Sequence, residues 1–191
     1  MTLTILTPPG AEPVTLSEAK AFLRITDTAE DALIAALVLA ARQRVEAELG
    51  LCLVSTALRE TFDGWDGRLT RTGAVRLSRG PLLSVQAVRT ADAAGVFHAL
   101  DADAYAPRVG SRPGRIAPAP GHGWPAPQIP DAGIQIDYTA GFGAEEDDVP
   151  APLAVAILVL TAHAVEHREA ADAPPIALVE PWLAPFRRVR L

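Results

Sequence analysis

Apolar residues recur at helical spacing in the N-terminal part of the chain. Thr15-Leu-Ser-Glu18 is a capping box, because the Thr15 hydroxyl can accept a hydrogen bond from the Glu18 amide while the Glu18 carboxylate reaches back. A short helix is therefore expected from Thr15 to about residue 25. A second helix is predicted over residues 30–49, and Gly50 follows it where a left-handed C-cap is favoured. Its apolar positions, three and four residues apart, are Ile34, Leu37, Val38, Ala41, Val45 and Leu49.

Between residues 51 and 138 the pattern changes to short alternating or β-branched runs separated by glycine and proline. We expect strands over residues 53–62, 75–77, 82–90, 96–100 and 134–138. A hairpin tip is predicted around Gly95, between the third and fourth of these strands. Residues 107–130 contain seven prolines, and this excludes a central strand. That segment is expected to be an exposed arm or a rim loop.

The last strand leads through a glycine turn and four acids, Glu145 to Asp148, into a long apolar run over residues 152–169. We expect a helix there, because Pro150 and Pro152 suit a helix entry and the acids complement the positive end of its dipole. Pro174 and Pro175 then break the chain. A short helix is expected around residues 176–183, limited by a further proline.

These elements predict an α+β protein. It is expected to consist of a helical bundle, made of the N-terminal helices and a long helix in the C-terminal half, with an inserted small antiparallel β domain and an extended C-terminal tail. The predicted boundaries are residues 1–50 for the N-terminal helices, 51–143 for the β-rich insertion with its proline-rich loop 107–130, 144–173 for the long helix and 174–191 for the tail.

Composition narrows the class of protein further. The 191 residues are 49% hydrophobic but only 5% aromatic, so alanine supplies much of the apolar content and favours closely packed helices. The net charge of −6 argues against a protein that grips DNA by its phosphates. Cys52 is the only cysteine, so no internal disulfide is possible. No apolar run is long enough to span a bilayer, and we expect no membrane contact.

One short motif suggests metal chemistry. His163, Glu166 and His167 fit the H-x-x-E-H pattern, in which two histidines ligate zinc and the glutamate is the general base of a hydrolase. Such a site needs a third ligand, and few acids follow His167. The alternative is a helix end whose histidines complement the negative pole of the dipole. We expect no metal, cofactor or catalytic residue, and keep a small zinc-dependent hydrolase as the alternative.

Two other segments allow a binding role. The stretch 121–125, which contains Trp124, could be a binding edge, or a loop pinned against the sheet by its tryptophan. In the C-terminal tail, apolar residues alternate with arginines, either as a solvated end or as an element that docks on a partner. The residues expected to dock are Trp182, Phe186, Arg187, Arg188, Arg190 and Leu191.

Several segments together resemble the head–tail connector (adaptor) proteins of long-tailed phages, prophages and gene transfer agents. They occur in the family's order and cover most of the chain. The segments are residues 14–24, 30–37 with Ala41 and Arg42, 79–85, 114–116, 138–143, 152–169 and 183–187.

The resemblance implies a structural protein with no catalytic activity. It would form a homo-oligomeric ring below the portal protein, a dodecamer if it follows portal symmetry. The ring would extend the DNA channel, through which DNA passes without sequence-specific binding, and would offer a platform for a stopper or tail-terminator protein. Assembly would take place in the host cytoplasm, and the finished protein would lie in the neck of a tailed particle. The tail would be the portal-docking element.

Overall fold

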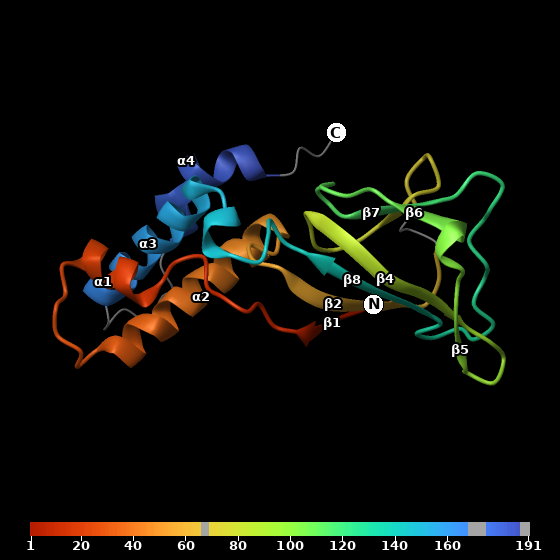
Figure 1. Ribbon diagram of the computed structural model, residues 1–191, viewed down its shortest axis with the longest axis horizontal. Coiled ribbons are helices and arrows are strands. Elements are labelled where there is room, and N and C mark those ends of the chain that lie inside the picture. The colour runs from red at the N-terminus through yellow and green to blue at the C-terminus, as the bar shows by residue number, and fades with distance from the viewer. Residues whose placement is uncertain (66–68, 168–174, 188–191) are drawn as a thin grey trace. The chain divides into compact units, whose positions relative to one another are not determined.

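The computed structural model describes residues 1–65, 69–167 and 175–187. The chain divides into two compact units. Met1–Pro9 and Gly50–Phe142 form one, here called the β unit, and Gly10–Leu49 and Gly143–Leu191 form the other, here called the helical unit. Figure 1 traces the elements of both along the chain. The protein is therefore α+β, as the sequence predicts.

Local signals in the sequence set the first two helices of the helical unit. Helix α1 spans Leu16–Leu23, and the predicted capping box is present: the Glu18 amide donates to Thr15 Oγ1 at 3.2 Å and the Thr15 amide donates to Glu18 Oε2 at 2.8 Å. Helix α2 spans Asp31–Leu49, and Gly50 follows it with φ of 64°. Because only glycine adopts this left-handed conformation without a steric cost, Gly50 ends the helix where the pattern predicts.

Helix α3 spans Ala151–Glu166 and is shorter than the predicted 152–169. The four acids precede this helix, as the sequence predicts. Glu146–Asp148 form a separate 3-10 turn, η2, in which the Glu145 amide donates to the Asp148 carboxylate at 3.0 Å. A local side-chain cap competes with helix extension for these acids, so α3 begins only after Pro150.

The core of the helical unit lies between α1, α2 and α3, where fully buried side chains meet: Ala19, Ile34, Val38, Val45, Leu49, Leu153, Ala156, Ile157 and Leu160. Three short turns follow, η3 at Ile176–Val179, α4 at Glu180–Leu183 and η4 at Ala184–Phe186. Both η3 and α4 pack on α3. Within the described residues, no helix combines the length and apolar character that a membrane crossing requires.

The β unit contains two antiparallel sheets. The larger has the strand order β1-β2-β8-β4-β5 and the smaller the order β3-β7-β6. The larger sheet is built from β1 (Thr2–Thr7), β2 (Thr56–Phe62), β4 (Leu82–Ala91), β5 (Phe97–Ala99) and β8 (Ile134–Ala140). The smaller is built from β3 (Val75–Arg76), β6 (Tyr105–Pro107) and β7 (Arg115–Pro118). The predicted hairpin at Gly95 joins β4 and β5.

One face of the larger sheet and one face of the smaller sheet supply the core of the β unit. Alternate residues of β2 and β8 point into it, among them Leu58, Phe62, Ile136 and Tyr138. Burial raises the pKa of the Tyr138 hydroxyl far above its ordinary range, so this group stays protonated.

Two strands differ from the sequence prediction. Strand β1 was not expected, and it places the first nine residues with the β unit rather than with the N-terminal helices. Strand β7 lies inside the proline-rich segment 107–130 and is the central strand of the smaller sheet, so the exclusion of a central strand there was wrong. The prolines flank β7: Pro113 precedes it and Pro118 is its last residue, which leaves the amides between them able to pair.

Candidate partner-binding surfaces

The described part of the C-terminal segment is helical and packs on its own unit, where the sequence predicted an extended tail. Val179 and Leu183 are fully buried. Trp182 and Phe186, two of the predicted docking residues, are only half-buried and keep part of their rings accessible. The apolar side chains of the segment therefore fall into two groups, one that anchors it to the helical unit and one that remains available to a partner.

Arg187 forms ion pairs within the helical unit. Its guanidinium donates to the Glu180 carboxylate at 2.8 and 2.7 Å, and it lies 2.7 Å from a carboxylate oxygen of Glu48. The hydrogen bonds from Arg187 lower the pKa of the Glu180 carboxyl, and they raise the pKa of Arg187 in turn. Of the other predicted docking residues, Arg188, Arg190 and Leu191 lie outside the described residues.

His163, Glu166 and His167 lie at the C-terminal end of α3. The two imidazole rings are 4.1 Å apart between centroids, and His167 Nδ1 lies 3.0 Å from the His163 carbonyl oxygen. Because a carbonyl oxygen can only accept, Nδ1 carries the proton and caps the helix end. Residues 1–65, 69–167 and 175–187 contain no group of three or more His, Cys, Asp or Glu that could hold a metal. The geometry gives no support to the zinc hydrolase alternative.

The loop that contains Trp124 is pinned, which decides between the two interpretations of residues 121–125. Trp124 stacks on Trp65 with 4.7 Å between ring centroids. The Trp124 indole donates to the Gly73 carbonyl at 2.9 Å, and the Trp65 indole donates to the Pro125 carbonyl at 2.8 Å. Two tryptophans thus hold the loop against the β unit by stacking and by reciprocal hydrogen bonds.

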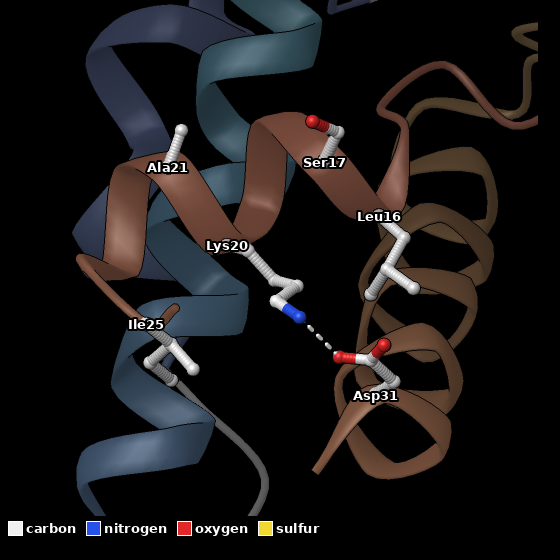
Figure 2. A pocket seen from close by; sticks show the side chains of 6 residues that line it. All are labelled: Leu16, Ser17, Lys20, Ala21, Ile25 and Asp31. Atoms are coloured by element: carbon white, nitrogen blue, oxygen red, sulfur yellow. Dashed lines mark hydrogen bonds and ion pairs between the residues drawn. The ribbon is translucent and has the colours of Figure 1, made fainter. Parts of the chain in front are cut away.

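A shallow hollow on the helical unit is lined by α1 and by the start of α2 (Figure 2). Its charged groups are Lys20 and Asp31, and the Lys20 ammonium is bonded to the Asp31 carboxylate at 2.5 Å. The pair neutralises itself, and the remaining lining residues are Leu16, Ser17, Ala21 and Ile25. The charged groups of this hollow therefore bind each other rather than a ligand.

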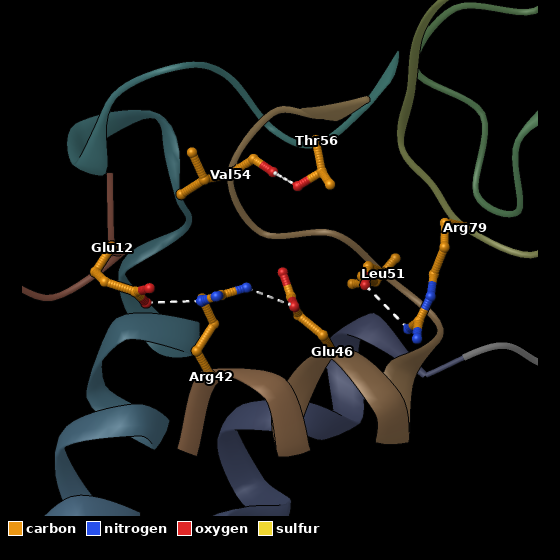
Figure 3. A network of polar contacts seen from close by, with 7 residues as sticks. All are labelled: Glu12, Arg42, Glu46, Leu51, Val54, Thr56 and Arg79. Carbon is orange, nitrogen blue, oxygen red and sulfur yellow. Dashed lines mark hydrogen bonds and ion pairs between the residues drawn. The ribbon is translucent and has the colours of Figure 1, made fainter. Parts of the chain in front are cut away.

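Two arginines, one in each unit, are held by acceptors within their own unit (Figure 3). In the helical unit, Arg42 is 6% exposed and donates to Glu12 at 2.6 Å and to Glu46 at 2.8 Å. In the β unit, Arg79 donates to the Leu51 carbonyl at 3.2 Å. A buried guanidinium needs such acceptors, because the cost of its desolvation is otherwise uncompensated. These arginines therefore have structural roles.

On the second face of the larger sheet, Asp137 of β8 lies between arginines from both neighbouring strands. Arg59 of β2 donates to it at 2.6 and 2.8 Å, and Arg89 of β4 donates at 2.7 Å. The hydrogen bonds from Arg59 in particular lower the pKa of the Asp137 carboxyl, and those from Arg89 add to the effect. The pairs join three strands and leave this face polar.

Three arginines lie in a row across the smaller sheet. Arg76 of β3 is directly opposite Arg115 of β7, and the Arg108 amide, just after β6, donates to the Arg115 carbonyl at 2.8 Å. Arg76 and Arg108 are exposed, and the Nε of Arg115 is buried with no acceptor. Like charges directly opposite each other on a sheet cost about 0.2–1 kcal/mol. We name this set the arginine row.

The outward face of α2 is apolar. Its exposed positions carry no charge from Ala32 to Ala47, and Leu33 and Leu39 are 41% and 39% exposed. The remaining exposed positions of that stretch are Ala35, Ala36, Ala40 and Gln43. A helix that is apolar on both its inner and its outer face is typical of one that is covered on both sides.

Neither the arginine row nor the outward face of α2 was among the sequence-predicted sites. The sequence carries a signal for the arginine row, since residues 69–91 and 104–130 contain seven arginines and no acid. Only the strand pairing, however, shows that Arg76 and Arg115 lie side by side. The signal for the outward face of α2 is the absence of polar residues from positions 32–41, which exceeds what one buried helix face requires.

The sequence of residues 13–88 matches the family described as "Phage gp6-like head-tail connector protein". Over the whole chain, the fold matches chains of solved particles at TM-scores of 0.82, 0.81 and 0.80, with 28%, 29% and 28% sequence identity. Each match covers 100% of this chain and 97% of the other. Among curated proteins, none has a significantly similar sequence.

The first of these chains is from the neck of an empty GTA particle with C6 symmetry, the second from the virion of a native gene transfer agent (GTA) particle, and the third from the neck of a native GTA particle with C12 symmetry. Sequence and fold therefore agree on one class, the structural proteins that connect the heads and tails of phages and gene transfer agents. Residues 13–88 are thus similar to the head–tail connector family, and the fold of the whole chain is similar to chains of GTA particles.

Proposed function

We propose that the chain forms a closed dodecameric ring below the portal, extends the DNA channel and supplies the platform for the next head-completion or tail protein. The observation that carries this proposal is the match over the full length of the chain to chains from GTA necks, one of them solved with C12 symmetry. A twelve-fold ring also has six-fold symmetry, so the C6 neck is compatible with the same arrangement.

The surface of the chain supports an assembled state. A ring forms from a heterologous interface, in which each copy presents two different surfaces to its two neighbours. The outward face of α2, with Leu33 and Leu39 exposed, is an apolar surface that a neighbour would cover. The net charge of −6 suits a channel through which DNA slides, because the protein as a whole repels the phosphate backbone.

We also propose that the C-terminal segment docks on the portal. Trp182 and Phe186 keep accessible apolar surface, and aromatic residues with neighbouring arginines are the usual anchors of protein interfaces. Arg187 is held by Glu180 and Glu48, so its part in docking would require an exchange of carboxylate partners. Arg188, Arg190 and Leu191 complete the proposed docking set.

The ring is tested in a particle-producing cell from which the gene for this chain has been deleted. Electron microscopy should show filled or empty heads without tails, and expression of the wild-type chain should restore complete necks. Symmetry analysis of the restored necks should give twelve copies. Intact tailed particles that lack the chain would contradict the proposal.

A further inference from the structure

The excess acid of this protein is confined to one of its two units. The β unit carries nine basic and eight acidic residues, whereas the helical unit carries eight basic and fifteen acidic residues. The net charges are therefore +1 and −7, which together give the −6 of the chain. A protein with such a division can attract other copies of itself, provided that the β unit of one meets the helical unit of the next.

Within the β unit, the positive charge is concentrated at the arginine row. No ion pair of the described residues involves Arg76, Arg108 or Arg115, whereas Arg59 and Arg89 on the larger sheet share Asp137. Repulsion between Arg76 and Arg115 weakens the pairing of β3 with β7. Two polar atoms of the same region, Arg115 Nε and Ser111 Oγ, are buried without a partner. Because Arg76 and Arg108 are exposed and form no ion pair among the described residues, their guanidinium groups can bind carboxylates of a partner.

A protein partner fits this surface better than DNA. The loop beside the arginine row exposes Val109 to 68%, and Leu69, which bridges to β3, is 40% exposed. Apolar side chains add affinity at a protein interface but gain little from a phosphate backbone. Arginine is itself enriched at protein interfaces because its planar fork binds carboxylates in a bidentate manner.

The densest group of acids in the helical unit is the turn around η2. Glu145 and Asp148 cap each other there. Glu146 and Asp147 lie between them, and neither belongs to an ion pair of the described residues. This turn is the natural complement of the arginine row.

We propose that the arginine row of one copy docks on the acidic turn, Glu145 to Asp148, of the neighbouring copy in the ring. The inference rests on the proposed ring and specifies its subunit contact. Carboxylates from the neighbour satisfy the arginines, remove the repulsion between Arg76 and Arg115, and give the interface a fixed head-to-tail direction. The same contact covers the arginines, so they cannot hold DNA that passes the ring.

Charge reversal tests this contact, because both halves of it lie on one chain. The first variant carries Arg76→Glu and Arg108→Glu, the second carries Glu146→Arg and Asp147→Arg, and the third carries all four changes. Each is expressed in cells that lack the wild-type chain, and complete necks are counted by electron microscopy. We expect at least a tenfold loss of complete necks for the first and second variants and recovery to near the wild-type number for the third.

Two controls separate docking from folding and from net charge. The change Arg76→Glu places an acid opposite Arg115, so the first variant should melt at or above the wild-type temperature. A variant with Arg24→Glu alone, which makes half the charge change of the first variant and lies outside both halves of the contact, should assemble normally.

The contact is wrong if either double variant assembles like the wild type, or if the fourfold variant fails to recover. It is also wrong if wild-type protein binds a fluorescent random-sequence DNA duplex at low salt and the first variant does not, since the row would then serve DNA. Failure of the wild-type chain to restore necks would instead contradict the proposed ring, independently of these variants.

Discussion

Asp137 determines how three strands of the larger sheet are held together on its polar face. A single carboxylate receives three hydrogen bonds from Arg59 and Arg89, which belong to the strands on either side. Since the folded protein holds the pKa of Asp137 below its unfolded value, the charged carboxylate stabilises the fold. This contribution is fully present above the unfolded pKa and is lost as the pH falls through the folded pKa.

We therefore expect Asp137→Asn to lower the free energy of unfolding by about 1–3 kcal/mol at pH 7, because two arginines lose a charged acceptor. The difference from wild type should shrink as the pH is lowered from about 5 toward 2. Urea unfolding at several pH values measures this. Asp103→Asn, at an exposed acid of the same unit, is the matched control and should change little. A difference that does not depend on pH would show that the charge of Asp137 is not what stabilises the sheet.

At the scale of elements, the helices were predictable and part of the sheets was not. The ends of α1 and α2 depend on Thr15, Glu18 and Gly50, which act on backbone within four residues of themselves. Strand β1 depends on pairing with β2, more than fifty residues further along the chain, and no local signal reports this. Strand β7 was not predicted because prolines exclude a central strand only where they interrupt its hydrogen-bonded amides. The prolines near β7 lie at its ends and leave those amides free to pair.

The candidate sites also differ in whether local sequence or tertiary contacts determine them. The docking role of the C-terminal residues is a prediction from composition alone, whereas the burial of Val179 and Leu183 against α3 depends on tertiary packing and was not predicted. The arginine row requires the register of β3 on β7.

Helix α2 allows a test of the outward apolar face. We expect Leu33→Glu with Leu39→Glu to leave the free energy of unfolding within about 0.5 kcal/mol of wild type, because both side chains are already exposed in the free chain. Complete necks should nevertheless be lost, since a neighbour would have to bury two charges. Thermal melting and electron microscopy measure the two effects.

Two further variants control that experiment. Replacement of both leucines by methionine keeps the surface apolar and should preserve assembly. Val38→Glu, on the inner face of the same helix, should unfold the helical unit, because Val38 is 2% exposed. Normal necks from the double glutamate variant would show that no partner covers this face.

For the molecule as a whole, the C-terminal segment combines two buried core residues with the residues that we propose dock on the portal. Leu183 and Val179 belong to the core of the helical unit, so removal of the segment from Pro181 onward would also damage the fold. Deletion of residues 188–191 leaves both side chains in place. This shorter deletion therefore tests docking without removing core side chains, which truncation at Pro181 would do.

We expect the chain without residues 188–191, further altered by Trp182→Ala and Phe186→Ala, to stay folded but to lose binding to purified portal. The loss of each half-buried aromatic anchor should cost about 2 kcal/mol or more per contact. Circular dichroism checks the fold, and co-sedimentation with the portal measures binding. The deletion alone and the two substitutions alone show which part contributes. Unchanged binding by the combined variant would place docking elsewhere, with the β unit as the next candidate.

The backbone crosses between the two units three times, after Pro9, after Leu49 and after Phe142, because strand β1 returns the start of the chain to the β unit. Neither unit is thus a continuous piece of sequence, and neither can be expressed by simple truncation. A single proteolytic cut at one crossing leaves the other two intact. Any force that tends to separate the units is therefore resisted by three covalent links rather than one.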